Sequence, residues 1–216
     1  IRDCLNARGV LGLKNSLLLS AGTALGGTVI AAFAAYAAAR HRGSLARSVH
    51  LLSTLTLSIP GLVLGLAYVL AFKRTALYET MGILIFSSII HFFTTPYLML
   101  YQTFGKLNAN LEGTGRVLGV PPFRLFASVF LPQCAETLLD MFSYFFLNAM
   151  VTISAVSFLA TAQTRPLSML VTQYSDQINP EGAAVLSFFI LTINLLVRGI
   201  VFLLKHLLCT PARAAQ

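Results

Sequence analysis

The sequence has little charge for its length. Only 10% of its 216 residues are charged, while 56% are hydrophobic and the mean hydropathy is +0.79. A soluble domain has about 25% charged residues. An all-buried soluble helical protein is the alternative, but its helices would still need polar outer faces. The shortage of charge therefore favours a protein embedded in a lipid bilayer.

Recognisable catalytic and metal-binding patterns are also missing. The sequence has no Gly-rich phosphate loop ending in Lys-Ser or Lys-Thr, no Gly-x-Ser-x-Gly elbow and no His-Glu-x-x-His pair, so it is not itself an ATPase of that type or one of those hydrolases. Its three cysteines and four histidines lack metal-ligand spacing. We therefore expect a non-enzymatic chain that binds no metal or cofactor. The cysteines are Cys4, Cys134 and Cys209.

Long neutral runs are what the sequence does contain. A membrane-spanning helix needs about 20 largely apolar residues. Five such runs occur, and four of them are long enough. The fifth, 182–197, becomes long enough only if Arg198 lies near the end of the span, where a long cationic side chain can extend to the interface. We predict an all-α polytopic membrane helical bundle, with one domain over 1–216 and about five spans: 15–39, 49–72, 82–104, 133–158 and 183–205.

The distribution of Lys and Arg gives a weak indication of topology. Three lie in 40–48, three in 105–132 and two in the C-terminal tail. The N-terminal stretch, 73–81 and 159–182 hold three, two and one. Cytoplasmic loops carry the excess of basic residues, so the loop 105–132 and the C-terminus are predicted to be cytoplasmic. The net charge of +8 then favours contact with the inner leaflet, and no nucleic-acid partner is expected.

Glycine and proline mark packing and bending within the spans. The pairs Gly22/Gly26 and Gly61/Gly65 each place two glycines on one helix face, which allows close backbone approach. Pro60 and Pro96 interrupt the second and third predicted spans, and proline in a helix bends its axis.

Polar side chains enter the fourth predicted span. Asn148, Thr152, Ser154 and Ser157 would occupy a broad face of one helix. Such a face points at other helices or at water. Interhelical hydrogen bonding and the lining of a translocation path are both open readings, and the path candidates are Asn148, Thr152 and Ser154.

The 22-residue segment Leu111–Pro132 is the one stretch suited to binding a partner outside the bilayer. Leu107, Leu111, Thr114 and Leu118 follow the spacing of one helical face. Gly119 is a helix stop and Pro121-Pro122 prevents continuation. A short helix, a rigid turn carrying Phe123 and a return to the membrane are typical of a docking element.

This segment resembles the EAA loop of binding-protein-dependent ABC importer permeases. That pattern is Glu-Ala-Ala, three residues, Gly, then Phe seven residues on and a closing Leu-Pro. The matching positions are Gly119, Arg124, Phe126, Val129, Leu131 and Pro132. At the front, 113–115 (Gly-Thr-Gly) occupies the Glu-Ala-Ala places, and Glu112 stands one position early.

The similarity extends over most of the chain. Asn15-Ser16-Leu17, Ala35-Tyr36, 59–72 and 146–159 look like this family. The last two are similar to the branch of 2-aminoethylphosphonate and ferric-iron permeases. Members of that branch often fuse two halves, so we expect this chain to be half of a longer, two-repeat permease.

The resemblance implies a MetI-like permease fold with a short cytoplasmic coupling helix in the bacterial inner membrane. It implies a translocation path formed with a second permease half, a periplasmic substrate-binding protein and a cytoplasmic ABC ATPase dimer that carries ATP and Mg. 2-Aminoethylphosphonate is the expected substrate and ferric iron the alternative; a passive channel or membrane scaffold is the rival class. The candidate ATPase-coupling residues are Glu112, Arg116, Leu118, Gly119, Val120, Pro121 and Phe123.

Overall fold

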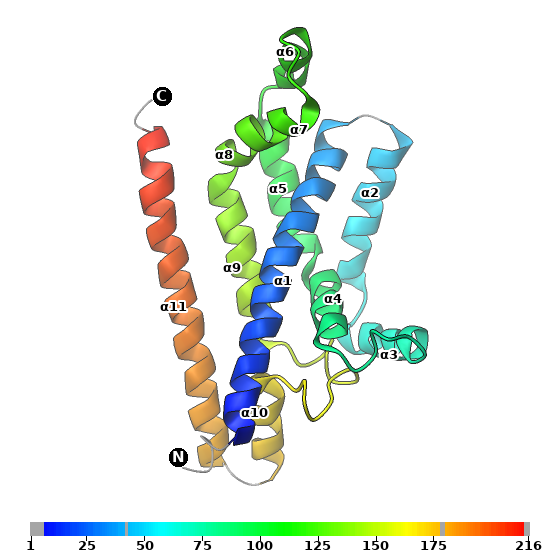
Figure 1. Ribbon diagram of the computed structural model, residues 1–216, viewed down its shortest axis with the longest axis vertical. Coiled ribbons are helices and arrows are strands. Elements are labelled where there is room, and N and C mark those ends of the chain that lie inside the picture. The colour runs from blue at the N-terminus through cyan, green and yellow to red at the C-terminus, as the bar shows by residue number, and fades with distance from the viewer. Residues whose placement is uncertain (1–6, 42, 178–179, 214–216) are drawn as a thin grey trace.

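The protein is a bundle of helices in the computed structural model, which describes residues 7–41, 43–177 and 180–213 (Figure 1). No strand occurs in those ranges. The elements are α1 (Ala7–Arg40), α2 (Ser44–Leu55), η1 (Thr56–Ser58), α3 (Gly61–Phe72), α4 (Met81–Phe92), α5 (Thr94–Lys106), α6 (Leu111–Val117), α7 (Pro122–Leu125), the π-helical turn η2 (Phe126–Phe130), α8 (Leu131–Gln133), α9 (Ala135–Val151), α10 (Leu167–Asp176) and α11 (Pro180–Arg213).

Helix α1 is the central element of the bundle. It packs against α9, α5, α4 and α10. Its buried positions are mostly small residues, among them Ala24, Ala31 and Ala35, which are completely inaccessible. Small side chains bring helix backbones together where lipid supplies no hydrophobic drive for association. α1 therefore touches most of the other long elements.

The prediction of about five spans agrees with the structure only if three of them are bent. Within the described part of the chain, two helices, over Gly9–Arg40 and Pro180–Leu207, are long and apolar enough to cross a bilayer alone. Three further pairs qualify if each bent pair is one span, which makes up to five. The first and last helices also exceed the predicted 15–39 and 183–205.

The second predicted span, 49–72, is not a single helix. The axis turns by 111° between Ser44–Ser58 and Gly61–Phe72. Ile59 is extended, with φ −101° and ψ 118°, as the residue before a proline prefers. Pro60 then opens α3, which projects away from the bundle (Figure 1). The bend expected at Pro60 exists, but it redirects the chain rather than kinking a continuous span.

The third predicted span, 82–104, bends by 54° between α4 and α5. The break falls at Phe93 rather than at Pro96. Pro96 instead occupies the first turn of α5, where a missing N–H is tolerated.

The fourth predicted span, 133–158, ends early. Helix α9 stops at Val151, and Thr152 is extended, with φ −65° and ψ 138°. The Thr152 carbonyl accepts a hydrogen bond from the Ser168 hydroxyl at 2.7 Å, so the freed carbonyl is satisfied inside the protein. The prediction that 148–157 forms one polar helix face is therefore wrong, because the helix stops at Val151 and a hydroxyl from α10, not a further helical turn, satisfies the Thr152 carbonyl.

Helix α11 continues well past Arg198, so this arginine does not lie near the helix end as expected. Its Nη1 lies 3.5 Å from the Ser143 hydroxyl on α9, to which it donates. About two turns further on, Lys205 pairs with Asp140 of α9 at 2.5 Å. These contacts attach α11 along the outside of the bundle.

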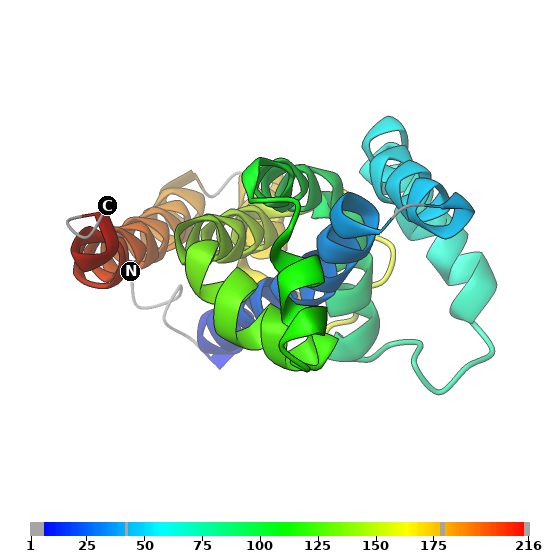
Figure 2. The same cartoon turned by 90° about the horizontal axis from the view of Figure 1, so that it is seen from above.

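The predicted grouping of loops agrees with the geometry. The α1–α2 turn, the α6–α7 loop and the C-terminal end of α11 lie at one end of the bundle, and α10 lies at the other (Figure 1). Seen from that end, α6–α8 cross the middle of the bundle, with α11 at one edge and α2–α3 at the opposite edge (Figure 2).

Several glycines sit where helices touch. Gly22 and Gly26 face Ile85 and Ile89 of α4. Gly61 and Gly65 face Ser154 and Ala155. Both glycine pairs noted in the sequence therefore mark close approaches.

Gly27 offers a direct test of the α1–α9 contact. A Cβ atom there would lie 2.8–2.9 Å from three atoms of the Phe145 ring, whereas Gly199 on α11 has nothing within 4 Å. We expect Gly27→Leu to lower the free energy of unfolding by about 1–3 kcal/mol, as overpacking does. Gly199→Leu is the matched control and should not destabilise. Thermal unfolding of the purified chain in detergent measures both, and equal effects would contradict this packing.

Candidate functional site

Helix α6 ends in a glycine-terminated cap. Gly119 has φ +68°, a conformation that glycine adopts without steric cost. The Gly119 N–H donates to the Arg116 carbonyl at 3.1 Å, and the Val120 N–H donates to the Gly115 carbonyl at 2.8 Å. These two bonds define a Schellman motif. The predicted stop at Gly119 is confirmed, although the helix begins at Leu111 and so excludes Leu107.

The loop presents apolar side chains to its surroundings. Leu118 and Phe123 are each 72% exposed, and Val117 is 87% exposed. We call Val117, Leu118 and Phe123 the docking patch. Sequence reasoning missed Val117, which lies outside the predicted helical stripe. Arg116, Gly119 and Pro121 are also exposed, whereas Val120 is half-buried and packs against the core.

Glu112 faces the interior of the chain. Its carboxylate accepts two hydrogen bonds from Arg40, Nε to Oε1 and Nη2 to Oε2, both at 2.6 Å. The Arg40 side chain is only 7% exposed. Hydrogen bonding by this guanidinium holds the pKa of Glu112 below its usual range, so the carboxylate is charged at neutral pH. Glu112 therefore fastens α6 to the end of α1.

An aromatic cluster supports the underside of the loop. Tyr36 of α1 lies with its ring centroid 4.9 Å from Phe126, 5.3 Å from Phe130 and 5.8 Å from Phe104. Phe104 and Phe130 are fully buried. Edge-to-face pairs of this kind add stability beyond burial, so α1, α5 and η2 form one rigid base.

The three predicted path residues lie on two different elements. Asn148 is on α9, where its Nδ2 donates to the Tyr144 carbonyl at 2.8 Å. Thr152 and Ser154 belong to the non-helical segment 152–166 that joins α9 to α10. Thr152 is 5% exposed and its hydroxyl oxygen has no hydrogen-bond partner.

Ser154 meets residues from two other elements. A Cβ placed on Gly61 of α3 would lie 2.5 Å from the Ser154 hydroxyl oxygen and 2.8 Å from Cε1 of His91 on α4. The segment 152–166, α3 and α4 therefore converge at Gly61. His91 is half-buried there.

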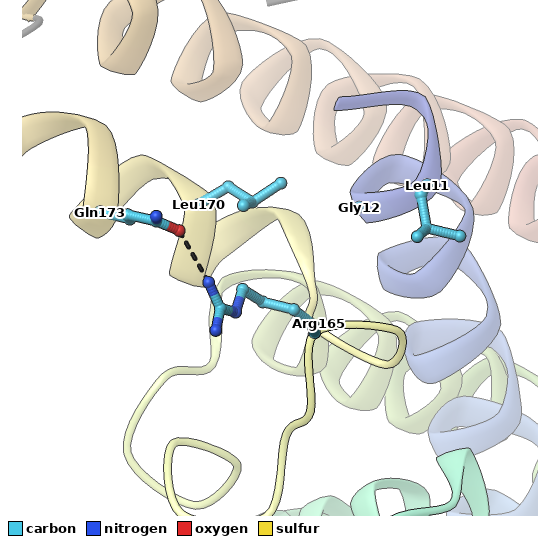
Figure 3. A pocket seen from close by; sticks show the side chains of 6 residues that line it. Leu11, Gly12, Arg165, Leu170 and Gln173 are labelled. Carbon is cyan, nitrogen blue, oxygen red and sulfur yellow. Dashed lines mark hydrogen bonds between the residues drawn. The ribbon is translucent and has the colours of Figure 1, made fainter. Parts of the chain in front are cut away.

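A cavity of about 270 Å³ lies between α1 and α10 (Figure 3), at the end of the bundle opposite α6 and α7 (Figure 1). Leu11 and Gly12 of α1 face it, as do Leu170 and Gln173 of α10. Arg165 donates from Nη1 to the Gln173 Oε1 at 2.7 Å. Sequence reasoning counted Arg165 only as a topology charge, because nothing in the chain order brings 11–12 to 165–173.

Metal-ligating side chains do not gather anywhere in the described ranges: no three His, Cys, Asp or Glu residues there could hold an ion together. Cys134 is buried and free, while Cys4 and the side chain of Cys209 lie outside the described residues.

The fold and site define a polytopic helical membrane protein with a short protruding helix and an exposed apolar patch. The sequence matches the family described as binding-protein-dependent transport system inner membrane component over residues 17–208. The chain belongs to this family of membrane transport subunits.

Curated relatives lie among ferric and polyamine permeases. One is the Fe(3+)-transport system permease protein FbpB 2 of Haemophilus influenzae, 28% identical over 89% of this chain and 38% of the relative. The ferric transport system permease protein FbpB of Actinobacillus pleuropneumoniae is 29% identical over 66% of this chain and 20% of its own length. The spermidine/putrescine permease PotC homolog of Mycoplasma genitalium is 29% identical over 56% and 44%. The chain thus spans less than half the length of each.

Proposed function

We propose that this chain is one permease half of an ATP-driven importer, in which the α6–α7 loop docks onto an ABC ATPase. The observation that carries the proposal is the docking patch: three large apolar side chains more than two-thirds exposed on a loop beyond the membrane-crossing helices. Monomeric soluble surfaces rarely leave contiguous apolar patches unused. A helix laid in a groove of a partner would cover it.

Besides this chain, the proposed assembly has three kinds of component. A second permease half, fused or separate, completes the path; a periplasmic binding protein delivers substrate; and two ATPase subunits carry ATP and Mg. The grouping of the 40–48, 105–132 and C-terminal segments at one end (Figure 1), with their excess of Lys and Arg, supports a cytoplasmic location for that end.

Ferric iron is the proposed substrate in place of the 2-aminoethylphosphonate first expected. Support comes from relatives whose names specify ferric transport, one of them aligned over 89% of this chain. The polyamine relative named above covers 56%. No phosphonate permease is among these relatives, so the phosphonate prediction has only the original resemblance behind it.

Reconstitution tests the proposal. The protein would be placed in liposomes with a candidate ABC ATPase and a candidate substrate-binding protein, and uptake of labelled ferric iron and 2-aminoethylphosphonate measured with and without ATP. We expect ferric uptake to rise at least about tenfold with ATP, a change of about 1.4 kcal/mol in barrier. Uptake that ignores ATP would identify a passive channel, and phosphonate uptake would overturn the substrate.

A further inference from the structure

Arg40, at the last position of α1, uses every donor of its guanidinium. Besides the two bonds to Glu112, Nη1 donates to the carbonyls of Phe104 at 3.3 Å and Leu107 at 3.1 Å, and Nη2 donates to that of Asn108 at 2.7 Å. An arginine has five N–H donors in a fixed fork, and all five are paired here. The fork joins α1 both to the end of α5 and to α6, in an orientation that a lysine cannot reproduce.

The N-terminal part of α1 is fastened in a similar way to the end of the segment 152–166 and to the first residue of α10. The Asn15 Nδ2 donates to the carbonyls of Gln163 at 2.7 Å and Arg165 at 3.1 Å. The neighbouring Ser16 hydroxyl accepts from the Leu167 N–H at 2.7 Å. Asn15 is 5% exposed and Ser16 is fully buried. Backbone groups of a non-helical segment inside a membrane protein need such partners, and α1 supplies them.

Between these two attachments α1 is one uninterrupted helix. Arg40 and Asn15 are 25 positions apart, which corresponds to about 38 Å along the axis at 1.5 Å per residue. Sharp helix bends usually occur at proline or at glycine pairs; α1 has no proline, and its one adjacent glycine pair, Gly26-Gly27, is packed against Ile89 of α4 and Phe145 of α9. A shift of one end along the axis must therefore appear at the other.

We infer that α1 is a rigid link that carries the movement of the coupling loop to the segment 152–166. Arg40 is the positioning residue at the loop end, and Asn15 with Ser16 holds the far end. The inference rests on the proposed function, because the ATPase must move the loop. Its consequence is local: displacing α1 moves the segment that carries Thr152 and Ser154, and thereby the contact of Ser154 with Gly61 of α3.

A purely static role for these bonds makes a different prediction. Static bonds would only hold the fold together, so their loss would lower stability and every activity in proportion. If the bonds instead transmit movement, their loss should remove only the response of the segment 152–166 to ATP, while the ATPase still binds. Coupling claims of this kind need a readout at the distant site.

The experiment uses the assembled complex with ATPase and binding protein. In a background free of other cysteines, Ser157→Cys, a half-buried position in the segment, is labelled with a small maleimide with and without ATP. The variants are Arg40→Lys and Asn15→Leu, separately and together. The matched controls are Arg47→Gln and Asn194→Leu. Arg47 is an exposed arginine at the same end of the bundle as Arg40, and the amide oxygen of Asn194 has no hydrogen-bond partner.

We expect ATP to change the labelling rate in the parent and both controls. In each link variant the change should shrink about tenfold, within the range typical of allosteric coupling, while the ATPase remains bound. The double variant should lose no more of the ATP-dependent change in labelling rate than the more severely affected single variant does, because one broken attachment already interrupts the link. If Arg40→Lys fails to assemble, Asn15→Leu alone decides the outcome.

An undiminished ATP response in both single variants, or additive losses in the double variant, would overturn the link. Failure of the proposed function has a separate signature, since an ATPase that does not bind the parent complex rejects the docking role and leaves nothing for α1 to transmit.

Discussion

Replacing Leu118 and Phe123 together by aspartate is expected to release the ATPase from the membrane complex and to reduce ATP-dependent uptake to background. Both side chains are 72% exposed, so the change does not disturb the core. Buried aromatic and aliphatic anchors at an interface contribute about 2 kcal/mol or more each, and a desolvated carboxylate adds a further penalty. Co-purification of the ATPase with the tagged permease measures its retention.

The control for this pair is Leu77→Asp. Leu77 is also an exposed leucine, at 53%, but it lies in the turn between α3 and α4, away from the loop 105–132. We expect it to retain the ATPase and uptake. Retention of the ATPase by the Leu118/Phe123 variant at parental levels would exclude the docking patch as the site of attachment.

The structure of the loop 105–132 is predictable from sequence because its signals are local. Gly119 followed by two prolines ends a helix whatever surrounds it, and the structure places the cap bonds there. Leu118 and Phe123 are apolar residues in a polar-and-turn segment, and they are exposed as a docking element requires. Val117 has the same character, but only the orientation of α6 shows that it joins them.

The contact between Arg40 and Glu112 could not be predicted from the sequence. Its partners are 72 positions apart, and the sequence pattern treats Arg40 as a topology charge and Glu112 as a displaced motif residue. Only the close approach of α1 to the end of α5, which depends on the small residues of α1, brings the two together. A contact set by packing leaves no periodicity for sequence analysis to detect.

Helix ends inside the apolar regions were missed for a related reason. The stretches 59–72 and 152–160 remain uncharged and largely hydrophobic across the points where the chain bends or stops being helical, so hydropathy alone extends each span. Irregular backbone at membrane depth is tolerated where protein groups satisfy it. The Ser168 hydroxyl does this for the Thr152 carbonyl, from 16 residues further along the chain.

Thr152→Val distinguishes the two readings of the polar residues near the end of α9. The Thr152 hydroxyl is buried and has no partner, and an unsatisfied buried polar group costs about 1–3 kcal/mol. Valine keeps the branched shape and removes that group, so we expect the free energy of unfolding to stay the same or increase. If Thr152 instead lines the path during transport, ferric uptake should fall by between about tenfold and a hundredfold, as expected for losing a hydrogen bond to a charged ligand.

Thr23→Val is the matched control, because Thr23 on α1 is fully buried and its hydroxyl also has no partner. It should match Thr152→Val in stability and keep parental uptake. Opposite signs for stability and uptake at Thr152 alone separate a transport role from a structural one, since a structural defect lowers both. Parental uptake by Thr152→Val would remove this residue from the path. Asn148→Leu would then test whether α9 lines the path, and it should alter uptake while the ATPase stays bound.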